Sequence, residues 1–283
     1  MKFTIALAQI DTVLGDVKKN IAKHLDVIKQ AKGGGADLIV FPELSLSGYA
    51  IKDMNWNVAV SASNTTLLQP LLKASDEISI VVGTVEESAE YGIYNSAFFI
   101  EDGNVLHVHR KIYLPTYGMF EEMRYFSQGK SVHAFQSKLG KFGLLVCEDL
   151  WHPALPYVLA KDEAQFIIGI AASPTRLSGN EARIQNAQVN IEHHKAYARL
   201  LSSYIVFCNR VGFEDGVNFW GGSEIVAPSG DILVQAKLFE EDLVFAEIDG
   251  NELRRARRLS RHYLDDDIEI VLDELLRIKH KRL

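Results

Sequence analysis

Short runs of apolar residues, rich in Val, Ile and Phe, recur along the whole chain at the length of single β-strands. Continuous apolar runs of this kind are typical of strands that are covered on both faces of a sheet. The sequence predicts such strands at residues 3–10, 37–41, 78–85, 142–147, 165–172, 204–208 and 243–248.

Helical spacing of apolar residues separates several of these runs. A first helix is predicted to begin after an N-cap at Asp16 and to end at the glycines 33–35, with one apolar face formed by Val17, Ile21, Leu25 and Ile28. Further helices are predicted at 181–201 and after the acidic residues 265–267, where the apolar face consists of Ile268, Leu272, Leu275 and Ile278.

Two segments are typical of β-hairpins. Residues 97–112 turn at Asp102-Gly103, and residues 222–236 turn near Ser229-Gly230. Helices that alternate with strands, together with hairpins, predict mixed sheets in a layered α/β sandwich rather than a barrel. Because no linker or break in composition divides the 283 residues, we expect a single domain over 1–283.

Composition and charge exclude several classes of protein. Hydrophobic residues make up 47% and charged residues 24%, which excludes a disordered chain. The net charge of −7 disfavours a general binder of nucleic acid or anionic membranes. Two cysteines are too few for a disulfide scaffold and are consistent with a reducing compartment. No apolar run approaches the roughly 18 residues of a membrane span, and the apolar N-terminal segment is too short for a secretory signal peptide. We therefore expect a cytoplasmic protein.

Polar residues that directly follow predicted strands are candidates for chemistry, because such positions are fixed by the sheet and open to solvent. Glu43 follows the strand 37–41, Cys147 ends the strand 142–147, and Lys111 leaves the first hairpin. A lysine beside the thiol would lower the cysteine pKa from about 8.5 and make it a nucleophile. A half-buried glutamate could accept the thiol proton and later activate water.

Each of these residues also has an ordinary structural interpretation. A free cysteine is commonly a small buried hydrophobe, a loop glutamate can serve as a cap, and a lysine can be solvated or ion-paired. The residues lie 68 and 36 positions apart, from 43 to 111 and from 111 to 147. Spacing alone therefore does not bring them into one site.

Three motifs in a fixed order supply the missing connection: VFPELSLSGY (40–49), HRKIYLPTYGMFEEMRYF (109–126) and GLLVCEDLWHP (143–153). They resemble the nitrilase, or carbon–nitrogen hydrolase, superfamily, and IAASP (170–174) and CNRVGFEDGVNFWGGSEIVAPSGD (208–231) extend the similarity over nearly the whole chain. The second and third motifs look most like the glutaminase domain of glutamine-dependent NAD synthetase. The resemblance implies a four-layer α-β-β-α sandwich when dimerised, and no cofactor.

By this resemblance Glu43 matches the general base, Lys111 the family lysine and Cys147 the nucleophile. Glu122 matches a second glutamate that positions substrate and lysine, and Glu121 is the alternative assignment by one position. The implied reaction is hydrolysis of a small linear amide through a thioester, with release of ammonia and a carboxylic acid. Lys111 acts there either as a proton donor or as a fixed charge that stabilises the oxyanion.

Further positions are candidates for substrate binding. Glu148, whose N–H is a candidate oxyanion donor, stands where nitrilases usually carry Trp, which favours amides over nitriles. Tyr117 and Ser173 are candidate pocket residues, and Arg176 or Arg183 is a candidate partner for a substrate carboxylate. The lack of an SGGxDS-type ATP-binding motif predicts a stand-alone hydrolase or a separate ammonia-supplying subunit.

Several alternatives stay open at this point. A Cys/His hydrolase would use His152, His193 or His194 as the activating base. No set of three or four residues has the spacing of metal ligands, so no metal is predicted. An N-carbamoyl amidase and a catalytically idle assembly partner are the other functional alternatives. The expected partner is a small amide, and we expect a homodimer or larger homo-oligomer, with the helix at about 265–281 as a candidate oligomerisation tail.

Overall fold

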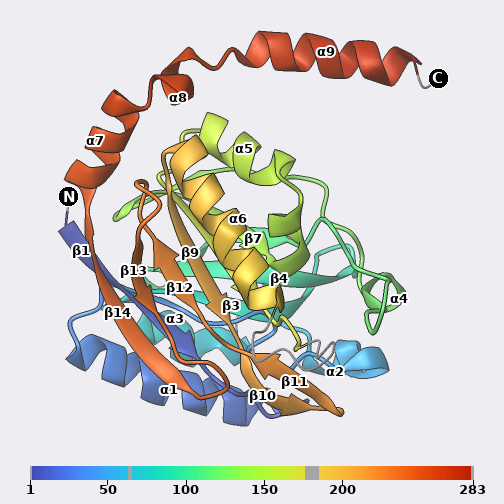
Figure 1. The fold of residues 1–283 in the computed structure, drawn as a ribbon. Helices are drawn as coiled ribbons and strands as arrows, with labels where there is room; N and C mark the ends of the chain where they lie inside the picture. Colours follow the sequence, from blue (N-terminus) through green and yellow to red (C-terminus); the bar gives the residue numbers. More distant parts are fainter. Residues whose placement is uncertain (1, 63–65, 176–184, 282–283) are drawn as a thin grey trace.

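The computed structural model describes residues 2–62, 66–175 and 185–281 (Figure 1). Twelve strands form two six-stranded mixed sheets. The first sheet contains, in spatial order, β14 (Asp242–Asp249), β1 (Lys2–Gln9), β2 (Leu38–Val40), β3 (Ser79–Glu87), β4 (Ile93–Glu101) and β5 (Asn104–Arg110). The second sheet contains β13 (Ile232–Gln235), β12 (Glu224–Val226), β9 (Tyr204–Asn209), β8 (Phe166–Ala171), β7 (Gly140–Val146) and β6 (Phe135–Ser137).

The helices lie on the outer faces of these sheets and at the end of the chain. The longer ones are α1 (Val17–Gly33), α5 (Ala154–Lys161), α6 (Gln185–Leu201), α7 (Gly250–Leu259) and α9 (Ile268–Lys281). The short ones are α2 (Asn55–Val58), α3 (Gln69–Ala74), α4 (Glu122–Tyr125) and α8 (Arg261–Asp265), together with the 3₁₀ helices η1 (Lys52–Met54), η2 (Thr66–Leu68) and η3 (Cys147–Trp151). None of the helices in the described ranges is both long enough and apolar enough to cross a membrane.

The elements predicted from apolar patterns are confirmed. Each predicted apolar run contains a strand, and α1 begins after Asp16, whose side chain accepts a hydrogen bond from the N–H of Lys19 at 3.1 Å. The first hairpin turns at Asp102 and Gly103 as predicted, but its first strand begins at Ile93 rather than at 97. The second predicted hairpin, 222–236, is confirmed as β12 and β13. A further hairpin of β10 (Val211–Glu214) and β11 (Val217–Trp220), and the helix α5, were not predicted.

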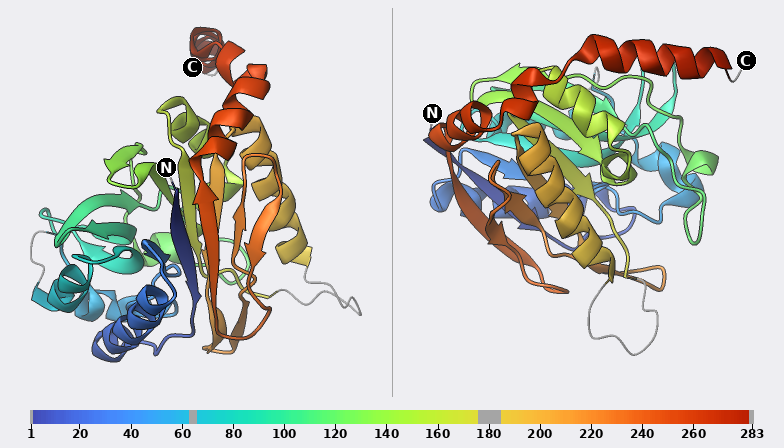
Figure 2. Two further views of the ribbon diagram at one scale, coloured as in Figure 1. Left: turned by 90° about the vertical axis from the view of Figure 1, so that its left-hand side faces the viewer. Right: turned by 45° about the horizontal axis from the view of Figure 1, so that its top comes forward.

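The two sheets pack face to face, and their inner side chains form one continuous core. Phe3 and Ile5 of β1 pack in this core with Phe142 of β7 and Phe166 of β8, and the rings of Phe3 and Phe166 lie 5.3 Å apart. Separate apolar clusters join α1 and α3 to the first sheet, and α5 and α6 to the second. Helices therefore cover the outer side of each sheet (Figure 2). The predicted α-β-β-α layering is thus confirmed, with the correction that all four layers lie within one chain and need no dimerisation.

Both sheets have parallel strands at their centres. β1, β2 and β3 run parallel to one another in the first sheet, as do β7, β8 and β9 in the second. Loops that follow the carboxyl ends of such strands are the usual location of binding and catalytic groups. The loops after β2, β7 and β8 therefore define the end of the sandwich where a site is expected.

The C-terminal segment leaves the sandwich. β14 is followed by α7, α8 and α9, and α9 lies away from the two sheets (Figure 1). None of the residues of α9 is buried, although its apolar residues Ile270 and Leu275 would favour burial. An amphipathic helix with an exposed apolar face is a feature that a partner surface would cover.

Candidate active site

Lys111 is the centre of a buried charge cluster. It directly follows β5, and its side chain has no exposed surface. Its Nζ donates hydrogen bonds to Oε1 of Glu43 at 2.8 Å and to Oε1 of Glu122 at 2.7 Å. Burial by itself lowers the pKa of a lysine, but the two carboxylates outweigh it and raise the pKa of Lys111 well above its usual value. The lysine is therefore a fixed positive charge between two acids.

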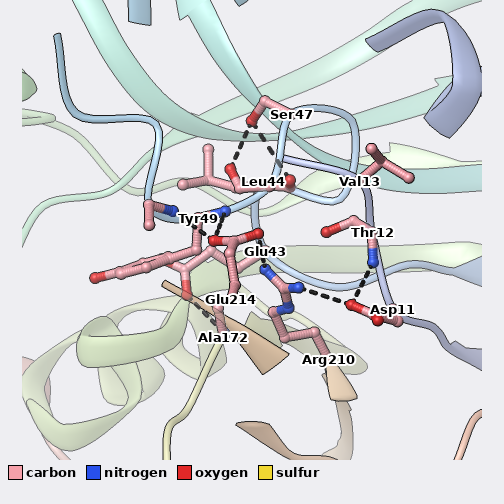
Figure 3. Close-up of polar contacts among 12 residues, drawn as sticks. Asp11, Thr12, Val13, Glu43, Leu44, Ser47, Tyr49, Ala172, Arg210 and Glu214 are labelled. Atoms are coloured by element: carbon pink, nitrogen blue, oxygen red, sulfur yellow. Dashed lines mark hydrogen bonds and ion pairs between the residues drawn. The ribbon is translucent and has the colours of Figure 1, made fainter. Parts of the chain in front are cut away.

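Glu43 lies three residues after β2 and is held through both carboxylate oxygens. Besides Lys111, Oε1 accepts a hydrogen bond from Nδ2 of Asn95 at 2.7 Å. Oε2 accepts one from the backbone N–H of Ala172 at 2.7 Å, directly after β8 (Figure 3). Because β2 and β8 belong to different sheets, this contact joins the two halves of the sandwich at the site. Neither Asn95 nor Ala172 was predicted, and the apolar pattern around Asn95 gives no signal of such a role.

Glu122, rather than Glu121, is in contact with the lysine. It is the first residue of α4 and is buried, whereas Glu121 is exposed. Burial and the nearby charge of Glu43 raise the pKa of Glu122 to about 7, against the opposing effects of Lys111 and of a hydrogen bond from Tyr49. Oε1 of Glu122 accepts the hydrogen bonds of Lys111 and Tyr49, and Oε2 is buried without a hydrogen-bond partner among the residues that the structure describes. An unpartnered buried oxygen favours a ligand that supplies a donor.

Cys147 is the first residue of η3 and directly follows β7. Its backbone has φ of 47°, a left-handed conformation that costs a non-glycine residue about 1–3 kcal/mol and is most common at functional sites. Burial and the negative charge of Glu43 raise the pKa of the thiol well above its usual value, although Lys111 acts in the opposite direction. Lys111 thus lowers the thiol pKa as predicted, but burial and the carboxylates outweigh it, so the predicted net lowering of the pKa is wrong. The resting group is a thiol, which needs a base before it can attack.

The loop that carries Tyr49 is fixed by a second buried ion-pair network, which the sequence analysis did not assign. Tyr49 donates its hydroxyl hydrogen to Glu122 at 2.6 Å. Its backbone N–H and that of Ala50 donate to Oε1 of Glu214 at 2.8 and 2.5 Å (Figure 3). Arg210 holds Oε2 of the same carboxylate at 2.9 Å. Arg210 and Glu214 belong to the motif at 208–231, so the motif itself was the available signal.

The predicted substrate-binding residues have different surroundings. The hydroxyl of Tyr117 donates to Oε2 of Glu148 at 2.8 Å, so these two side chains lie together beside the nucleophile turn. Ser173 is bound within the protein, because its hydroxyl oxygen accepts a hydrogen bond from Nε1 of Trp220 at 3.0 Å. The candidates Arg176 and Arg183 lie outside the described residues.

Two hollows flank the cluster. One, of about 100 Å³, is lined by Tyr49, Glu122 and Phe219 among others. The other, of about 250 Å³, is lined by Tyr117 and Glu148 together with residues of the loop after β5. One hollow therefore adjoins Glu122, and the other adjoins Glu148.

The arrangement does not favour the Cys/His alternative. The charges that act most strongly on Cys147 are those of Glu43, Lys111 and Glu122. The three candidate histidines have other neighbours: His152 stacks on Tyr113, His193 packs edge-on against Trp151, and His194 bonds to Glu224.

Comparisons with known proteins agree with the geometry. The sequence profile of the family described as carbon-nitrogen hydrolase matches residues 4–258. A glutamine-dependent NAD(+) synthetase of Acinetobacter baylyi is 34% identical over 252 residues, which cover 89% of this chain and 45% of that protein. The chain thus spans less than half the length of this relative.

Solved structures give the same result. Glutamine-dependent NAD+ synthetase from Acinetobacter baumannii, in complex with ADP, superposes with a TM-score of 0.79 at 32% identity, over 89% of this chain and 47% of that one. A carbon-nitrogen hydrolase from Helicobacter pylori G27 shares the fold with a TM-score of 0.84 at 24% identity, over 97% and 98% of the two chains. The family match includes Glu43, Lys111 and Cys147, and the chain belongs to the carbon–nitrogen hydrolase family.

Proposed function

We propose that this protein is a thiol amidohydrolase that cleaves the carbon–nitrogen bond of a small linear amide and releases ammonia and a carboxylic acid. The observation that carries the proposal is the buried ammonium group of Lys111, which bridges Glu43 and Glu122 next to the Cys147 thiol. A buried cation between two acids is costly unless each charge is paired, so such a cluster is typical of a functional site.

The reaction follows from the protonation states. Glu43 accepts the thiol proton while the sulfur of Cys147 bonds to the amide carbon, and negative charge develops on the carbonyl oxygen. Lys111 and the N–H of Glu148 stabilise this oxyanion. Glu43 then donates its proton to the leaving nitrogen, ammonia departs, and a thioester remains. Water, deprotonated by Glu43, attacks the thioester, and the acid and the thiol are released.

The unpartnered oxygen of Glu122 supports an amide over a nitrile as the substrate. Oε2 of this residue is buried and accepts no hydrogen bond from residues 2–62, 66–175 or 185–281. The –NH₂ group of a primary amide supplies a donor for it, whereas a nitrile nitrogen has no hydrogen. A site built to accept such a hydrogen bond rejects an analogue that lacks it, because the polar oxygen would stay unpaired.

The carboxylate of Glu148 supports the proposal that the substrate carries a cationic group. The Glu148 carboxylate is mostly buried, adjoins the nucleophile and lines the 250 Å³ hollow with Tyr117. A carboxylate in such a position favours an ammonium group, as found in the α-amino end of glutamine-like amides. This supports the glutaminase-type, ammonia-supplying alternative over an N-carbamoyl amidase.

Ammonia release from a panel of amides, N-carbamoyl compounds and nitriles tests the proposal. We expect primary amides to be the best substrates, and those with an α-amino group to have the lowest KM. Cys147→Ala should abolish turnover without unfolding the protein, whereas Cys208→Ala, at the other, fully buried cysteine, should retain it. Turnover by Cys147→Ala would refute the thioester route, and a wild-type protein inert toward the whole panel would favour the idle assembly partner.

We also propose that the protein is a homodimer or a larger homo-oligomer, in which a second copy covers the apolar face of α9. The proposal is supported by the exposed apolar residues of this helix, among them Ile270 and Leu275. A reaction that depends on a reduced thiol at Cys147 supports a reducing, cytoplasmic location.

A further inference from the structure

Asp149 is a fully buried residue of η3 that the reaction described above does not use. Its Oδ1 accepts hydrogen bonds from the backbone N–H groups of Ile112 and Tyr113, each at 3.0 Å. Its Oδ2 accepts one from the N–H of Val146 at 3.1 Å and lies 2.8 Å from Nε2 of His109, whose side chain is also buried. Since a carboxylate offers only acceptors, Nε2 of His109 is the donor.

These four contacts connect the two segments that carry the lysine and the nucleophile. His109 and Ile112 flank Lys111, and Val146 directly precedes Cys147. The two segments lie at the carboxyl ends of β5 and β7, which belong to different sheets, so no ladder of strand hydrogen bonds sets the distance between them. The carboxylate of Asp149 provides a direct polar link between the two chain ends.

We propose that Asp149, together with His109, is a positioning residue that sets the location of the Lys111 ammonium relative to the Cys147 thiol. The inference rests on the proposed amide hydrolysis. Hydrogen bonds to a charged acceptor are stronger and more directional than neutral ones. A displacement of about 1 Å between reacting groups can lower a rate by about 100-fold. Asp149 touches neither substrate nor reacting atoms and acts only through the segments that it joins.

The variant Asp149→Asn tests this role. Its amide keeps one acceptor oxygen for Ile112 and Tyr113, but its –NH₂ group then faces the donors of Val146 and His109. We expect kcat for the best amide of the panel to fall by about 100-fold with KM changed by less than about threefold, since the residues that line the two hollows keep their side chains. His109→Gln, which can still donate, should retain much more activity than His109→Leu.

Glu101→Gln is the matched control. Glu101 is also buried, and its Oε2 accepts from the hydroxyls of Ser79 and Ser137, each at 2.8 Å, so it too links the first sheet to the second. It lies six residues along β4 from Asn95, which is about 20 Å in an extended strand. This variant therefore measures the cost of weakening a buried link between the sheets away from the site.

Alkylation of Cys147 by iodoacetamide, followed by intact mass, provides a second measurement that needs no turnover. We expect the rate to fall at least tenfold in Asp149→Asn and in His109→Leu, but not in His109→Gln or Glu101→Gln. Equal kcat and equal alkylation rates in Asp149→Asn and Glu101→Gln would overturn the inference. If Asp149→Asn does not fold, the two His109 variants decide, and equal rates for that pair overturn it. A wild-type protein without amidase activity would refute the proposed function, while the alkylation rates would still test the positioning role.

Discussion

Gly83 is the position where the smallest change in sequence should displace Glu43, the proposed general base. It lies in β3, and its Cα faces the chain segment that carries Glu43. A Cβ built on Gly83 would lie 2.3 Å from the backbone N of Leu44 and 2.4 Å from the carbonyl O of Pro42. Ordinary contact begins at 3.4 Å, so Gly83→Ala requires the segment to retreat by 3.4 − 2.3 = 1.1 Å. Both obstructing atoms are backbone atoms, which no rotamer change can move.

That retreat would break the geometry of the Glu43 carboxylate. Its contacts with Lys111, Asn95 and Ala172 are 2.7–2.8 Å long, and 1.1 Å more would place the partners beyond hydrogen-bond distance. We expect Gly83→Ala to lower kcat for amide hydrolysis by about 100-fold, from the usual effect of a displacement of about 1 Å on a reacting group. Overpacking of this kind should cost about 1–3 kcal/mol of stability.

The assay is the initial rate of ammonia release, measured with the melting temperature of each variant. Gly33→Ala in α1 is the control, because a Cβ at Gly33 meets no heavy atom within 4 Å. The reasoning is refuted if folded Gly83→Ala has a kcat within about twofold of that of Gly33→Ala. Such a result would mean that the backbone around Glu43 yields without moving the carboxylate.

Three further perturbations test other parts of the structure. Tyr49→Phe removes a hydrogen bond that lowers the pKa of Glu122 from an even higher value to about 7. The pKa of Glu122, followed by NMR titration, should therefore rise by about one unit, and an unchanged pKa would contradict the assigned contact. Burial lowers the pKa of His24 to about 4, so between pH 6.5 and pH 4 only the unfolded chain gains its proton, and stability should fall as pH falls through this window by about 3 kcal/mol. Urea unfolding should show a shallower pH dependence in His24→Gln, and equal slopes would argue against this assignment. Removal of residues 268–283 should lower the number of subunits found by sedimentation, and an unchanged assembly would show that α9 does not hold it together.

The fold was predictable where a single property repeats along the chain. Buried strands read as apolar runs, and α1 has both a regular apolar face and a capping Asp16. The hairpin of β10 and β11 was missed because its strands are short and partly exposed. Its signal was nevertheless present: Asp215 and Gly216 at the turn have φ of 50° and 79°, the backbone that Asp-Gly favours in tight hairpins.

For the site, the residues could be predicted from the sequence, but the electrostatics could not. Family motifs pointed to Glu43, Lys111 and Cys147, and the structure places them in one buried cluster. The sign of the thiol pKa shift was wrong, because it was inferred from one lysine and one thiol. In the structure Cys147 also lies in the field of Glu43, Glu122 and Glu148, so three carboxylates and burial outweigh a single ammonium group. The net pKa shift depends on how many charged groups lie close to the thiol in the folded protein. The sequence does not show that number, because the groups come from distant segments.

The same balance explains why a raised thiol pKa is compatible with nucleophilic catalysis. A permanent thiolate beside three carboxylates would be repelled, and Lys111 would have to neutralise it instead of the oxyanion. In the proposed reaction the thiol is protonated at rest, and Lys111 stays paired with Glu43 and Glu122 until the proton moves to Glu43. That transfer removes the carboxylate charge facing the lysine, which can then stabilise negative charge on the substrate oxygen. In the proposed reaction, this proton transfer therefore links activation of the sulfur to release of the cation.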